Sequence, residues 1–441
     1  MNRLRERLFH KLVTVAFALA VALGGVGCGT PAVPPATATP ADVAPPVTIQ
    51  LWYWSILRPD LGTDQYRTLI DDWNAERTDI HIEATAYDME EYRSKIKTSL
   101  AAGEAPDMFY MWSGSFVRPY LRTGNMLPID TYHTGDVKAR IKPGMLEACM
   151  DGGKTYSVPI YTFIANLYCN TELFEQAGAV IPKTYDELLA AVKTLRGHGI
   201  TPIALGEKDR WPGMYWYNIL AMRHAGLQGA SQALQYPALF ERAAFLEAAE
   251  KLLELHENGA FSENAFEMGF VDMLDSFRNG EAAMMYQGDW VAATIEDESS
   301  PTKDVVTLVP FPVVPGGDGS AYEFLGGNID SYYIRADTEH PDEAVEVLLD
   351  LSERAGKEGE AAGLGISCWK IAPDESAQTP PLAAQSVALM ETGRGYLGWW
   401  DTILPAASAE THKSLVADLL DGRVTPEEFT MEMAKLVGSQ P

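Results

Sequence analysis

Residues 277–290 read FRNGEAAMMYQGDW, and this stretch passes from a helix end through a strand to a tryptophan. Asn279–Gly280 predicts the end of a helix, because glycine readily adopts the left-handed conformation in which many helices stop. The apolar run Ala282–Tyr286 predicts a buried strand. The chain is expected to leave the sheet through Gly288–Asp289. Trp290 would then stand at the carboxyl end of a buried strand, where ligands bind in many α/β proteins.

Strands and helices alternate through the first quarter of the chain. Strand-like runs occupy Val47–Trp54, Ile80–Ala84 and Pro106–Trp112. Helical stripes of apolar residues are predicted at Thr63–Arg77 and Met89–Ala102. Strands separated by helices of this length favour right-handed crossovers and a parallel sheet. The predicted fold class is therefore α/β.

Local signals indicate helix boundaries farther along the chain. Thr184 and Thr425 each begin a capping box, in which the threonine hydroxyl caps the helix and a glutamate three residues later reaches back. Two more helices are predicted at Glu241–Asn258 and, following Pro341, at Asp342–Arg354. These helices extend the α/β pattern into the C-terminal part.

Size and charge limit the classes of function. A chain of 441 residues is too long for one ordinary core, so two domains are the default expectation. Its formal net charge is −27, with 61 Asp and Glu against 34 Lys and Arg. This surplus disfavours nucleic acid and anionic headgroups as partners, but it is compatible with a neutral ligand. We expect a monomer that binds no nucleic acid.

Residues 1–27 resemble a bacterial lipoprotein signal peptide. A basic region precedes the apolar segment Leu12–Gly25, which is too short to span a bilayer as a stable helix. Cys28 would become the acylated N-terminus, and residues 28–46, rich in Pro, Ala and Thr, would form an extended tether. Secretory cleavage near Gly27 is the alternative, because glycine replaces the leucine usual three positions before the cysteine. Either route leads out of the cytoplasm, and acylation would anchor the protein to the cell membrane.

Motifs for catalysis and metal binding are missing from the sequence. Gly152–Thr155 ends like a phosphate-binding loop, but Ala148 stands where the loop requires a glycine. There is no C-x-x-C, no H-E-x-x-H and no G-x-S-x-G. We therefore assign no catalytic residue, no metal and no cofactor, although the many carboxylates leave a glycosidase pair open.

Three cysteines follow Cys28, and the sequence leaves their state open. Cys149 and Cys169 could form a disulfide outside the reducing cytoplasm, with Cys368 free. Isolated buried thiols are the equal alternative.

Several tryptophans lie where a predicted element ends. In open parallel sheets, ligands bind beyond the carboxyl ends of the strands, and an indole exposed there is poorly hydrated unless something covers it. A single tryptophan is more often core than ligand platform, so Trp73 and Trp216 are assigned to the core. Five others stand beside Ser, Asp or Gly at element boundaries, and jointly they predict a cleft, with two of them expected to be packing. These five are Trp54, Trp112, Trp290, Trp399 and Trp400.

Aromatic faces beside carboxylates and amides suit sugars. A pyranose has an apolar C–H face that stacks on indole, and its hydroxyls form hydrogen bonds sideways. Asp289, Asp401, Asn328 and Asn166 are the expected polar partners. The sequence therefore predicts an uncharged saccharide as the ligand.

A series of short motifs, in order along the chain, resembles those of a known family. Asp151–Pro159 resembles the family's DGK-x-YGVP, Pro182–Leu188 its P-x-TW-x-EL, and residues 277–290 its F-x-x-G-x-AAM-x-x-x-G-x-W. The other matching segments are Gly103–Asp107, Asn166–Phe174, Pro310–Pro312 and Gly326–Asn328. The chain is thus similar to family 1 of the extracellular solute-binding proteins, receptor lipoproteins of sugar ABC importers that are related to maltose-binding protein.

The resemblance implies a periplasmic-binding-protein type II fold. In that fold two α/β lobes, joined by a hinge, close on a ligand held in the cleft between them. The lobe boundaries expected here are residues 47–162 with 306–336 for the first lobe, and residues 163–305 with 337–441 for the second. The tryptophan that ends the opening stretch is expected to stack on the sugar.

The predicted ligand-binding set combines tryptophans at the ends of predicted helices and strands with nearby polar residues. Maltose-binding protein carries charged ligand contacts where this chain has Gly114 and Ser115, and Cys169 replaces the usual tyrosine, so the particular sugar stays open. The complete predicted set is Trp54, Ser55, Trp112, Ser113, Asn166, Trp211, Asp289, Trp290, Gly327, Asn328, Trp399, Trp400 and Asp401.

The resemblance implies binding without chemistry. The protein would capture a sugar or oligosaccharide between its lobes, dock on permease subunits in the membrane and release the sugar there. Two alternatives stay open. The same fold could bind a polyamine, peptide or metal chelate, since aromatic rings also hold cations, and a secreted glycoside hydrolase would share the aromatics and carboxylates.

Overall fold

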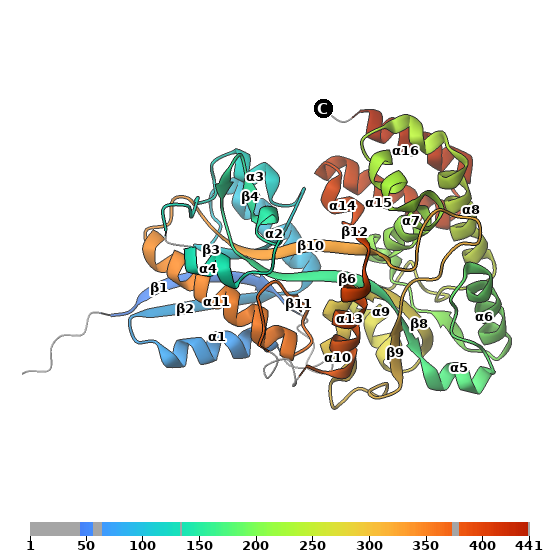
Figure 1. Ribbon diagram of the computed structural model, residues 1–441, viewed down its shortest axis with the longest axis horizontal. Coiled ribbons are helices and arrows are strands. Elements are labelled where there is room, and N and C mark those ends of the chain that lie inside the picture. Colours follow the sequence, from blue (N-terminus) through green and yellow to red (C-terminus); the bar gives the residue numbers. More distant parts are fainter. Residues whose placement is uncertain (1–44, 56–63, 133–134, 373–378, 440–441) are drawn as a thin grey trace, which may run out of the picture. The chain divides into compact units, whose positions relative to one another are not determined.

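In the computed structural model, one mixed sheet extends through the part of the chain from Pro46 onward (Figure 1). Its main strands, in spatial order, are β2 (Ile80–Tyr87), β1 (Val47–Trp54), β3 (Met108–Trp112), β10 (Glu323–Ile334), β6 (Pro159–Asn170), β8 (Ala282–Gly288) and β7 (Thr201–Ile203). β1 pairs in parallel with β2 and β3, and β7 pairs in parallel with β8. The predicted parallel pairing is confirmed at these two ends of the sheet, whereas β6 and β10 run antiparallel to their neighbours.

The structure describes residues 45–55, 64–132, 135–372 and 379–439. Cys28, the predicted signal peptide and the tether through residue 44 lie outside these residues. Within them, no helix combines the length and the apolar content that a membrane span requires.

Two long strands, β6 and β10, connect two groups of elements. Every residue of β6 is buried, and its C-terminal half pairs with β8, while Asp330–Ile334 of β10 pairs with β3. The first group comprises β1, β2 and β3 with α1 (Gln65–Glu76), α2 (Met89–Ala102) and α11 (Pro341–Ala361). The second group comprises β7 and β8 with α7 (Trp211–Ala233), α8 (Ala243–Glu257), α15 (Ala406–Leu420) and α16 (Pro426–Gly438). In Figure 1, α2 lies above the sheet of the first group, and α1 and α11 lie below it.

Shorter elements complete the two groups. Further helices are α3 (Arg118–Arg122), α4 (Gly135–Arg140), α5 (Thr171–Ala177), α6 (Tyr185–Gly197), α9 (Phe270–Arg278), α10 (Ala292–Glu296), α13 (Pro381–Thr392) and α14 (Trp400–Ile403). Further strands are β4 (Met150–Asp151), β5 (Lys154–Thr155), β9 (Val306–Val309), β11 (Ile366–Ser367) and β12 (Gly395–Leu397). β9 and β11 pair with β6, and β12 pairs with β10.

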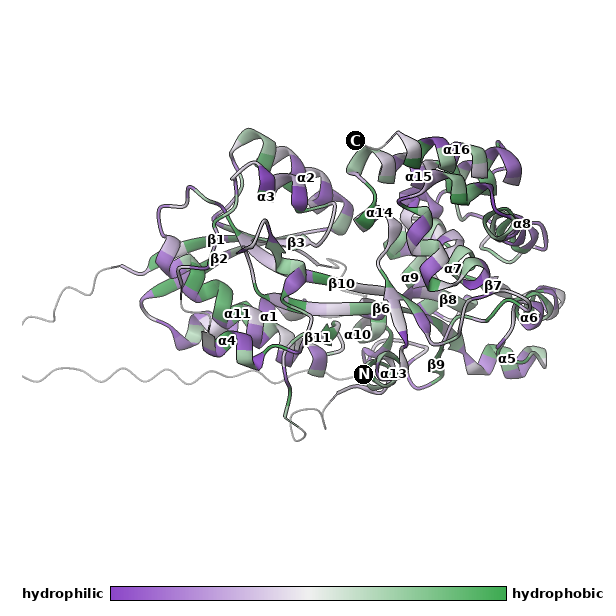
Figure 2. Ribbon diagram, turned by 45° about the horizontal axis from the view of Figure 1, so that its top comes forward, coloured by the Kyte–Doolittle hydropathy of each residue, from purple (hydrophilic) through white to green (hydrophobic). Residues whose placement is uncertain are grey.

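The core follows the alternation read from the sequence. Ile49, Leu51 and Tyr53 alternate along β1, so they point to one face of the sheet, and all three are fully buried. The helices alternate hydrophobic and hydrophilic residues, which Figure 2 shows as green and purple bands along single ribbons. Each group therefore has the layered helix–sheet–helix packing that burying both faces of a sheet requires.

Local helix signals hold where they were predicted. Both capping boxes, at Thr184 and Thr425, are formed in full, and α2 ends at Gly103 in the left-handed conformation. Several boundaries differ by one or more residues, and two of these differences are informative. The helix predicted from Glu241 begins at Ala243, after a 3-10 turn. α11 continues seven residues past the predicted end at Arg354, to Ala361, because its glycines allow the helix to lie directly against β6.

The three cysteines are free and buried. Cys149 and Cys169 do not form a disulfide, so the alternative of isolated buried thiols is confirmed. The Sγ of Cys149 lies 3.2 Å from the hydroxyl oxygen of Ser331, and burial raises the pKa of this thiol to about 12. Such thiols are poor nucleophiles and serve as small apolar side chains.

The predicted lobe boundaries stay a prediction. α11 packs against α1, β1 and β10, all of which contribute to the first group. This packing favours placing α11 with the first lobe rather than with the residues 337–441 assigned to the second.

Candidate ligand-binding pocket

A pocket lined mainly by aromatic rings lies where the two groups face each other. The space that it leaves for water-sized molecules is about 40 Å³, and all the space between its atoms, including the part open to solvent, is about 510 Å³. The lining residues are Trp54, Met89, Arg93, Trp112, Phe116, Phe163, Trp211, Tyr215, Trp290, Asn328, Asp330, Trp399, Asp401 and Thr402. Seven of the thirteen predicted binding residues belong to this lining, namely Trp54, Trp112, Trp211, Trp290, Asn328, Trp399 and Asp401.

The first wall is built from the ends of two neighbouring strands. β1 ends at Trp54 and β3 ends at Trp112, and because β1 and β3 pair in parallel both indoles emerge at the same edge. Their rings are stacked with centroids 6.5 Å apart and planes 23° apart. Both side chains are only partly buried. The expectation of tryptophans at the carboxyl ends of strands is met at this wall.

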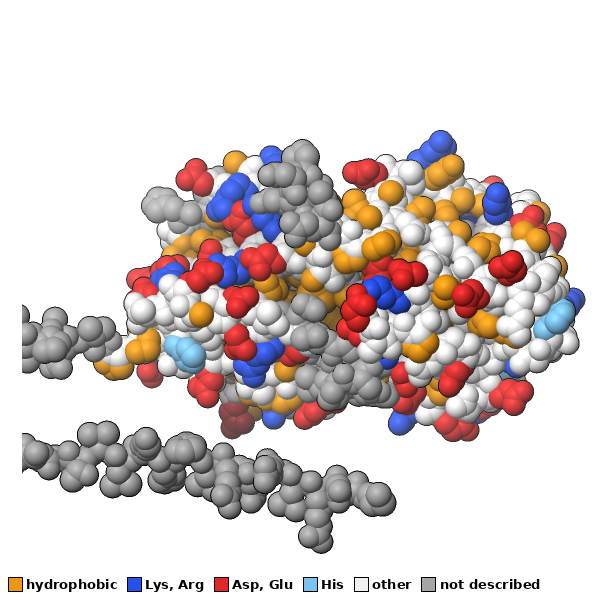
Figure 3. All heavy atoms as spheres, turned by 90° about the horizontal axis from the view of Figure 1, so that it is seen from below, with side chains coloured by type: hydrophobic (Ala, Val, Ile, Leu, Met, Phe, Trp, Pro, Cys, Tyr) orange, Lys and Arg blue, Asp and Glu red, His pale blue; other side chains and the backbone are white. Residues whose placement is uncertain are grey.

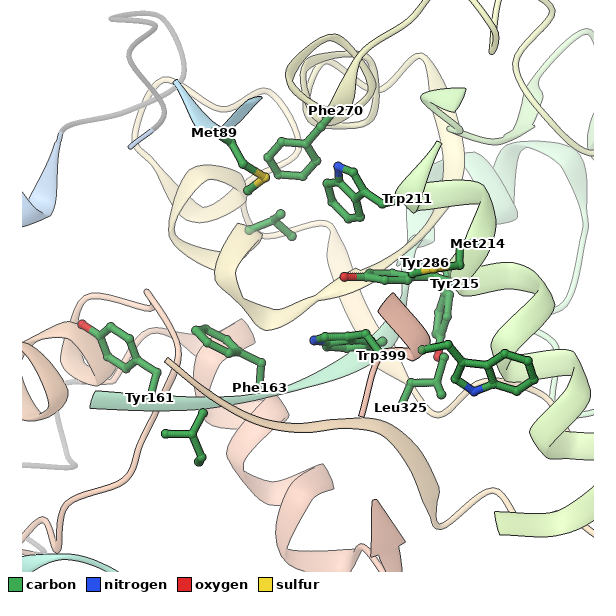
Figure 4. Close-up of a cluster of buried hydrophobic side chains, with 14 of the residues drawn as sticks. Met89, Tyr161, Phe163, Trp211, Met214, Tyr215, Phe270, Tyr286, Leu325 and Trp399 are labelled. Carbon is green, nitrogen blue, oxygen red and sulfur yellow. The ribbon is translucent and has the colours of Figure 1, made fainter. Parts of the chain in front are cut away.

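The second wall comes from the other group of elements. Trp399 stacks on Tyr215 of α7 with centroids 4.5 Å apart (Figure 4). Trp290 stands edge-on to Trp399 at 5.7 Å and to Phe163 at 5.4 Å. Trp211, the first residue of α7, lies beside the ring of Phe270, as Figure 4 also shows. The pocket thus has aromatic rings on both sides.

The glycine of the Gly288–Asp289 corner has a steric role. A Cβ on Gly288 would overlap the six-membered ring of Trp290, so only glycine lets this indole fold back over the strand end. Asp289 and Trp290 follow in a 3-10 turn. The corner therefore turns the indole toward the pocket instead of continuing the strand.

Trp400 belongs to the core, and its assignment to the binding set is corrected. It is fully buried, in edge contact with Tyr217 and Phe240 and stacked on His412. Trp399 and Trp400 are adjacent at the start of α14, but their indoles have different neighbours, since Trp399 stacks on Tyr215 and Trp400 stacks on His412. One of the pair lines the pocket while the other anchors the segment in the second group.

Five other predicted residues also lie off the pocket lining. Ser113 is buried, and its backbone N–H and hydroxyl both bond Ile329 of β10, holding β3 to β10. Ser55 extends β1 by donating its N–H to Tyr87. Gly327 is exposed beside Tyr396. Asn166 and Asp289 are fully enclosed and are described next. These residues shape the strands that carry the pocket rather than its surface.

Asp289 and Asn166 belong to a buried polar chain next to α13. The amide of Asn166 donates to the hydroxyl oxygen of Ser386, which in turn donates to Asp289 at 3.0 Å. Burial raises the pKa of Asp289 to about 8, against the hydrogen bonds that lower it. The second carboxyl oxygen of Asp289 is buried without a partner among the described residues. A protonated carboxyl suits this environment better than a charged one.

Asp289→Asn is expected to change how stability depends on pH. The pKa of Asp289 is raised in the folded protein, so the folded state keeps a proton that the unfolded state loses above about pH 4. The free energy of unfolding of the wild type should therefore fall, relative to the variant, as the pH rises from about 4 to 8. Urea unfolding at pH 5 and pH 8.5 measures this difference. Asp72→Asn, at an exposed position, is the control, and a constant difference between Asp289→Asn and wild type at both pH values would contradict the prediction.

Two carboxyls and one guanidinium give the pocket its charge. Burial raises the pKa of Asp330 to about 7 although the Tyr110 hydroxyl donates to it at 2.6 Å. Burial also raises the pKa of Asp401. Arg93 of α2 lowers the pKa of both carboxyls through its positive charge. The pocket therefore holds polar groups of both kinds among its rings.

Sequence reasoning missed several lining residues, of which Arg93 is the most informative. It lies four residues after Met89 and three before Ile96, on the buried stripe of α2. A charged residue at such a position is a signal of a polar site, because a guanidinium is rarely placed against a core. Phe163, Tyr215 and Asp330 gave no comparable signal, since each reads as an ordinary strand or helix residue.

Asn328 and Thr402 fix the segment that carries Trp399. The Asn328 amide donates to the hydroxyl of Thr402 at 2.7 Å, and its carbonyl accepts the N–H of Trp399 at 3.1 Å. The N–H of Ser115, after β3, donates to the carbonyl of Thr402 at 2.7 Å. The first wall and the segment of Trp399 are thus joined directly by hydrogen bonds.

Comparison with known proteins decides the family. The family model described as bacterial extracellular solute-binding protein matches residues 60–349, about two thirds of the chain. The chain belongs to this family. The type II solute-binding fold, with two α/β lobes, a hinge and an interlobe cleft, is confirmed by the likeness to solved structures.

Two curated relatives match this chain over part of their length. A multiple sugar-binding protein of Streptococcus mutans is 22% identical over 339 residues, which cover 72% of this chain and 75% of the relative. An ABC transporter extracellular-binding protein of Pyrococcus horikoshii, itself uncharacterized, is 24% identical, and the match covers 57% of this chain and 56% of that protein.

Solved structures match over nearly their whole length. A protein from work on xylan utilization by the thermophilic bacterium Caldanaerobius polysaccharolyticus is 32% identical, with a TM-score of 0.83, and the match covers 88% of this chain and 99% of that one. A chitin oligosaccharide binding protein is 24% identical with a TM-score of 0.78, covering 89% and 98%. The second likeness establishes the fold alone.

Proposed function

We propose that this solute-binding protein captures a neutral sugar or oligosaccharide in the aromatic pocket and delivers it to the permease subunits of an ABC importer. The observation that carries the proposal is the pair of facing aromatic walls. Trp54 and Trp112 stand on one side, and Trp290 and Trp399 on the other. Indole faces take the C–H faces of sugar rings, and the polar lining groups take hydroxyls.

The similar proteins support a saccharide as the ligand class. The sugar-binding protein of Streptococcus mutans and the protein from work on xylan utilization are both connected with carbohydrate by name. Figure 3 shows Asp and Glu side chains scattered over the face it displays rather than gathered in one patch. That distribution favours an uncharged ligand over a polyamine, which a concentrated acidic surface would attract.

Closure of two lobes about β6 and β10 is the proposed mechanism. Ligand binding shifts the population toward the closed form only by the difference between its affinities for the closed and open forms. The closed monomer would then dock on the permease. Cys28 is the proposed acylation site, which would hold the protein at the outer side of the cell membrane on its tether.

A ligand screen tests the function. Xylotriose, chitotriose and raffinose should be offered to the purified protein together with spermidine, and thermal unfolding and titration calorimetry should follow each. We expect a rise in Tm and a measurable Kd for at least one saccharide, because a ligand that binds only the folded state stabilises it. Binding of spermidine alone would favour a polyamine receptor. Release of shorter sugars during incubation would instead reveal a glycoside hydrolase.

A further inference from the structure

The guanidinium of Arg93 lies among three aromatic rings of the pocket. Its central carbon is 5.1 Å from the ring centroid of Trp112, 5.6 Å from that of Phe116 and 5.7 Å from that of Trp211. Trp112 and Phe116 belong to the first group, and Trp211 begins α7 of the second. The side chain is 18% exposed. Arg93 is thus a cation held against both walls of the pocket.

Among the described residues, this guanidinium forms an ion pair with Glu90 but has few hydrogen-bond acceptors. Its Nε is buried and has no partner, and among the described residues no oxygen accepts a hydrogen bond from Arg93. The nearest carboxylate, Glu90 on the same helix, stands 3.6 Å from Nη1 and is itself 46% exposed. Five N–H donors in a fixed fork require acceptors, and leaving buried ones unpaired is unfavourable. Aromatic faces stabilise the charge but do not accept these hydrogen bonds as oxygen does.

Other unpaired buried atoms of the pocket lining repeat this imbalance. The indole nitrogens of Trp54 and Trp290 are buried donors without partners in the described residues, whereas the indole of Trp211 interacts with the Glu90 carboxylate. Indole N–H can only donate. One carboxyl oxygen of Asp401 is the corresponding unpaired acceptor. The lining therefore offers more unpaired donors than acceptors, and a ligand that fits it must supply acceptor oxygens.

We propose that Arg93 is a specificity-determining residue that donates hydrogen bonds to acceptor oxygens of the bound saccharide. This inference rests on the proposed function. Hydroxyl oxygens of a sugar can serve as acceptors in the plane of the guanidinium fork. The same residue disfavours polyamines, because its guanidinium carries the same positive charge as an ammonium group. Arg93 would thereby restrict the ligands of this pocket to molecules that supply acceptor oxygens.

Measuring how Arg93 variants bind altered ligands distinguishes direct hydrogen bonding to the ligand from a merely structural role of Arg93. The variants are Arg93→Met, which keeps length without donors, and Arg93→Lys, which keeps the charge without the fork. Lys97→Met, at an exposed position on the same helix, is the matched control. The probe is whichever of xylotriose, chitotriose and raffinose binds the wild type most tightly, with the series of its analogues that each lack one hydroxyl. Circular dichroism and Tm establish that each variant is folded.

We expect the removal of one ligand hydroxyl and the replacement of Arg93 to have non-additive effects on binding affinity. Arg93→Met should weaken binding about 10- to 100-fold, Arg93→Lys should weaken it less, and Lys97→Met should leave it unchanged. The hydroxyl whose removal weakens binding to the wild type should matter little in Arg93→Met. Equal losses for every analogue in wild type and Arg93→Met, or unchanged affinity of folded Arg93→Met, would overturn this inference alone. A wild type that binds no saccharide would overturn the proposed function, and this inference with it.

Discussion

Gly114→Ala is expected to weaken saccharide binding about 5- to 150-fold, since overpacking against Thr402 disfavours the closed form by about 1–3 kcal/mol. Gly114 follows β3 and has a φ of 71°. A Cβ at this position would overlap the backbone carbonyl oxygen of Thr402. That oxygen cannot move aside freely, because it belongs to a segment anchored by Trp400 in the core.

The contact at Gly114 exists only while the two groups are together. The N–H of Ser115 donates to the carbonyl of Thr402 at 2.7 Å, and its hydroxyl donates to the carbonyl of Asp401 at 2.6 Å. These bonds join the loop after β3 to α14 across the edge of the pocket. A methyl group inserted there opposes closure but not folding of either group. Because the ligand binds the closed form, its apparent affinity falls with the population of that form.

Titration calorimetry and small-angle scattering of Gly114→Ala measure affinity and closure separately. Gly124→Ala is the matched control, since Gly124 has a similar φ of 76° but open space around it. The control should lose a little stability and keep its affinity. Equal affinity losses in the two variants would show that backbone strain, and not the contact with Thr402, is responsible.

Trp290→Ala is expected to lower saccharide affinity by roughly 1–3 kcal/mol, or about 5- to 150-fold. The indole is only partly buried, and its ring edges are held by Phe163, Trp399 and Trp211 at 5.4–6.3 Å. It is therefore a rigid platform whose remaining surface is available to a ligand. Removing it takes away apolar contact with the sugar ring, and calorimetry of the variant measures the loss.

Trp400→Phe provides the comparison for Trp290→Ala. Trp400 is fully buried, and its indole N–H has no partner in the described residues, so phenylalanine removes volume without breaking a hydrogen bond. This variant should lower the free energy of unfolding and leave affinity unchanged. If Trp290→Ala kept the wild-type Kd for the sugar, Trp290 would be packing and not a platform.

Helix ends could be predicted because their signals are local. The capping boxes at Thr184 and Thr425 and the stop at Gly103 depend on residues within one turn, and all three appear as expected. The extension of α11 depends instead on a distant partner. Gly359 lies where any Cβ would overlap the hydroxyl of Tyr161 in β6, and sequence spacing carries no information about that approach.

The pocket could be predicted in outline but not residue by residue. Aromatic residues at strand ends reach the same edge of a parallel sheet, so Trp54 and Trp112 followed from the strand pattern. Trp399 and Trp400 are neighbours with the same local sequence signals, and only the tertiary packing of α14 decides which of them faces the pocket. Arg93 was missed because it lies inside a helix, away from the turns where binding residues are usually sought.

The two shared strands make the halves of this molecule dependent on each other. β10 pairs with β3 of the first group, β6 pairs with β8 of the second, and β6 and β10 pair with each other, so unfolding of either half would remove hydrogen-bond partners from a strand on which the other half depends. Denaturation should accordingly behave as one cooperative event rather than as two separable transitions. A fragment that carries only one half would expose a sheet edge whose pairing strand is missing, and such an edge makes it prone to aggregate.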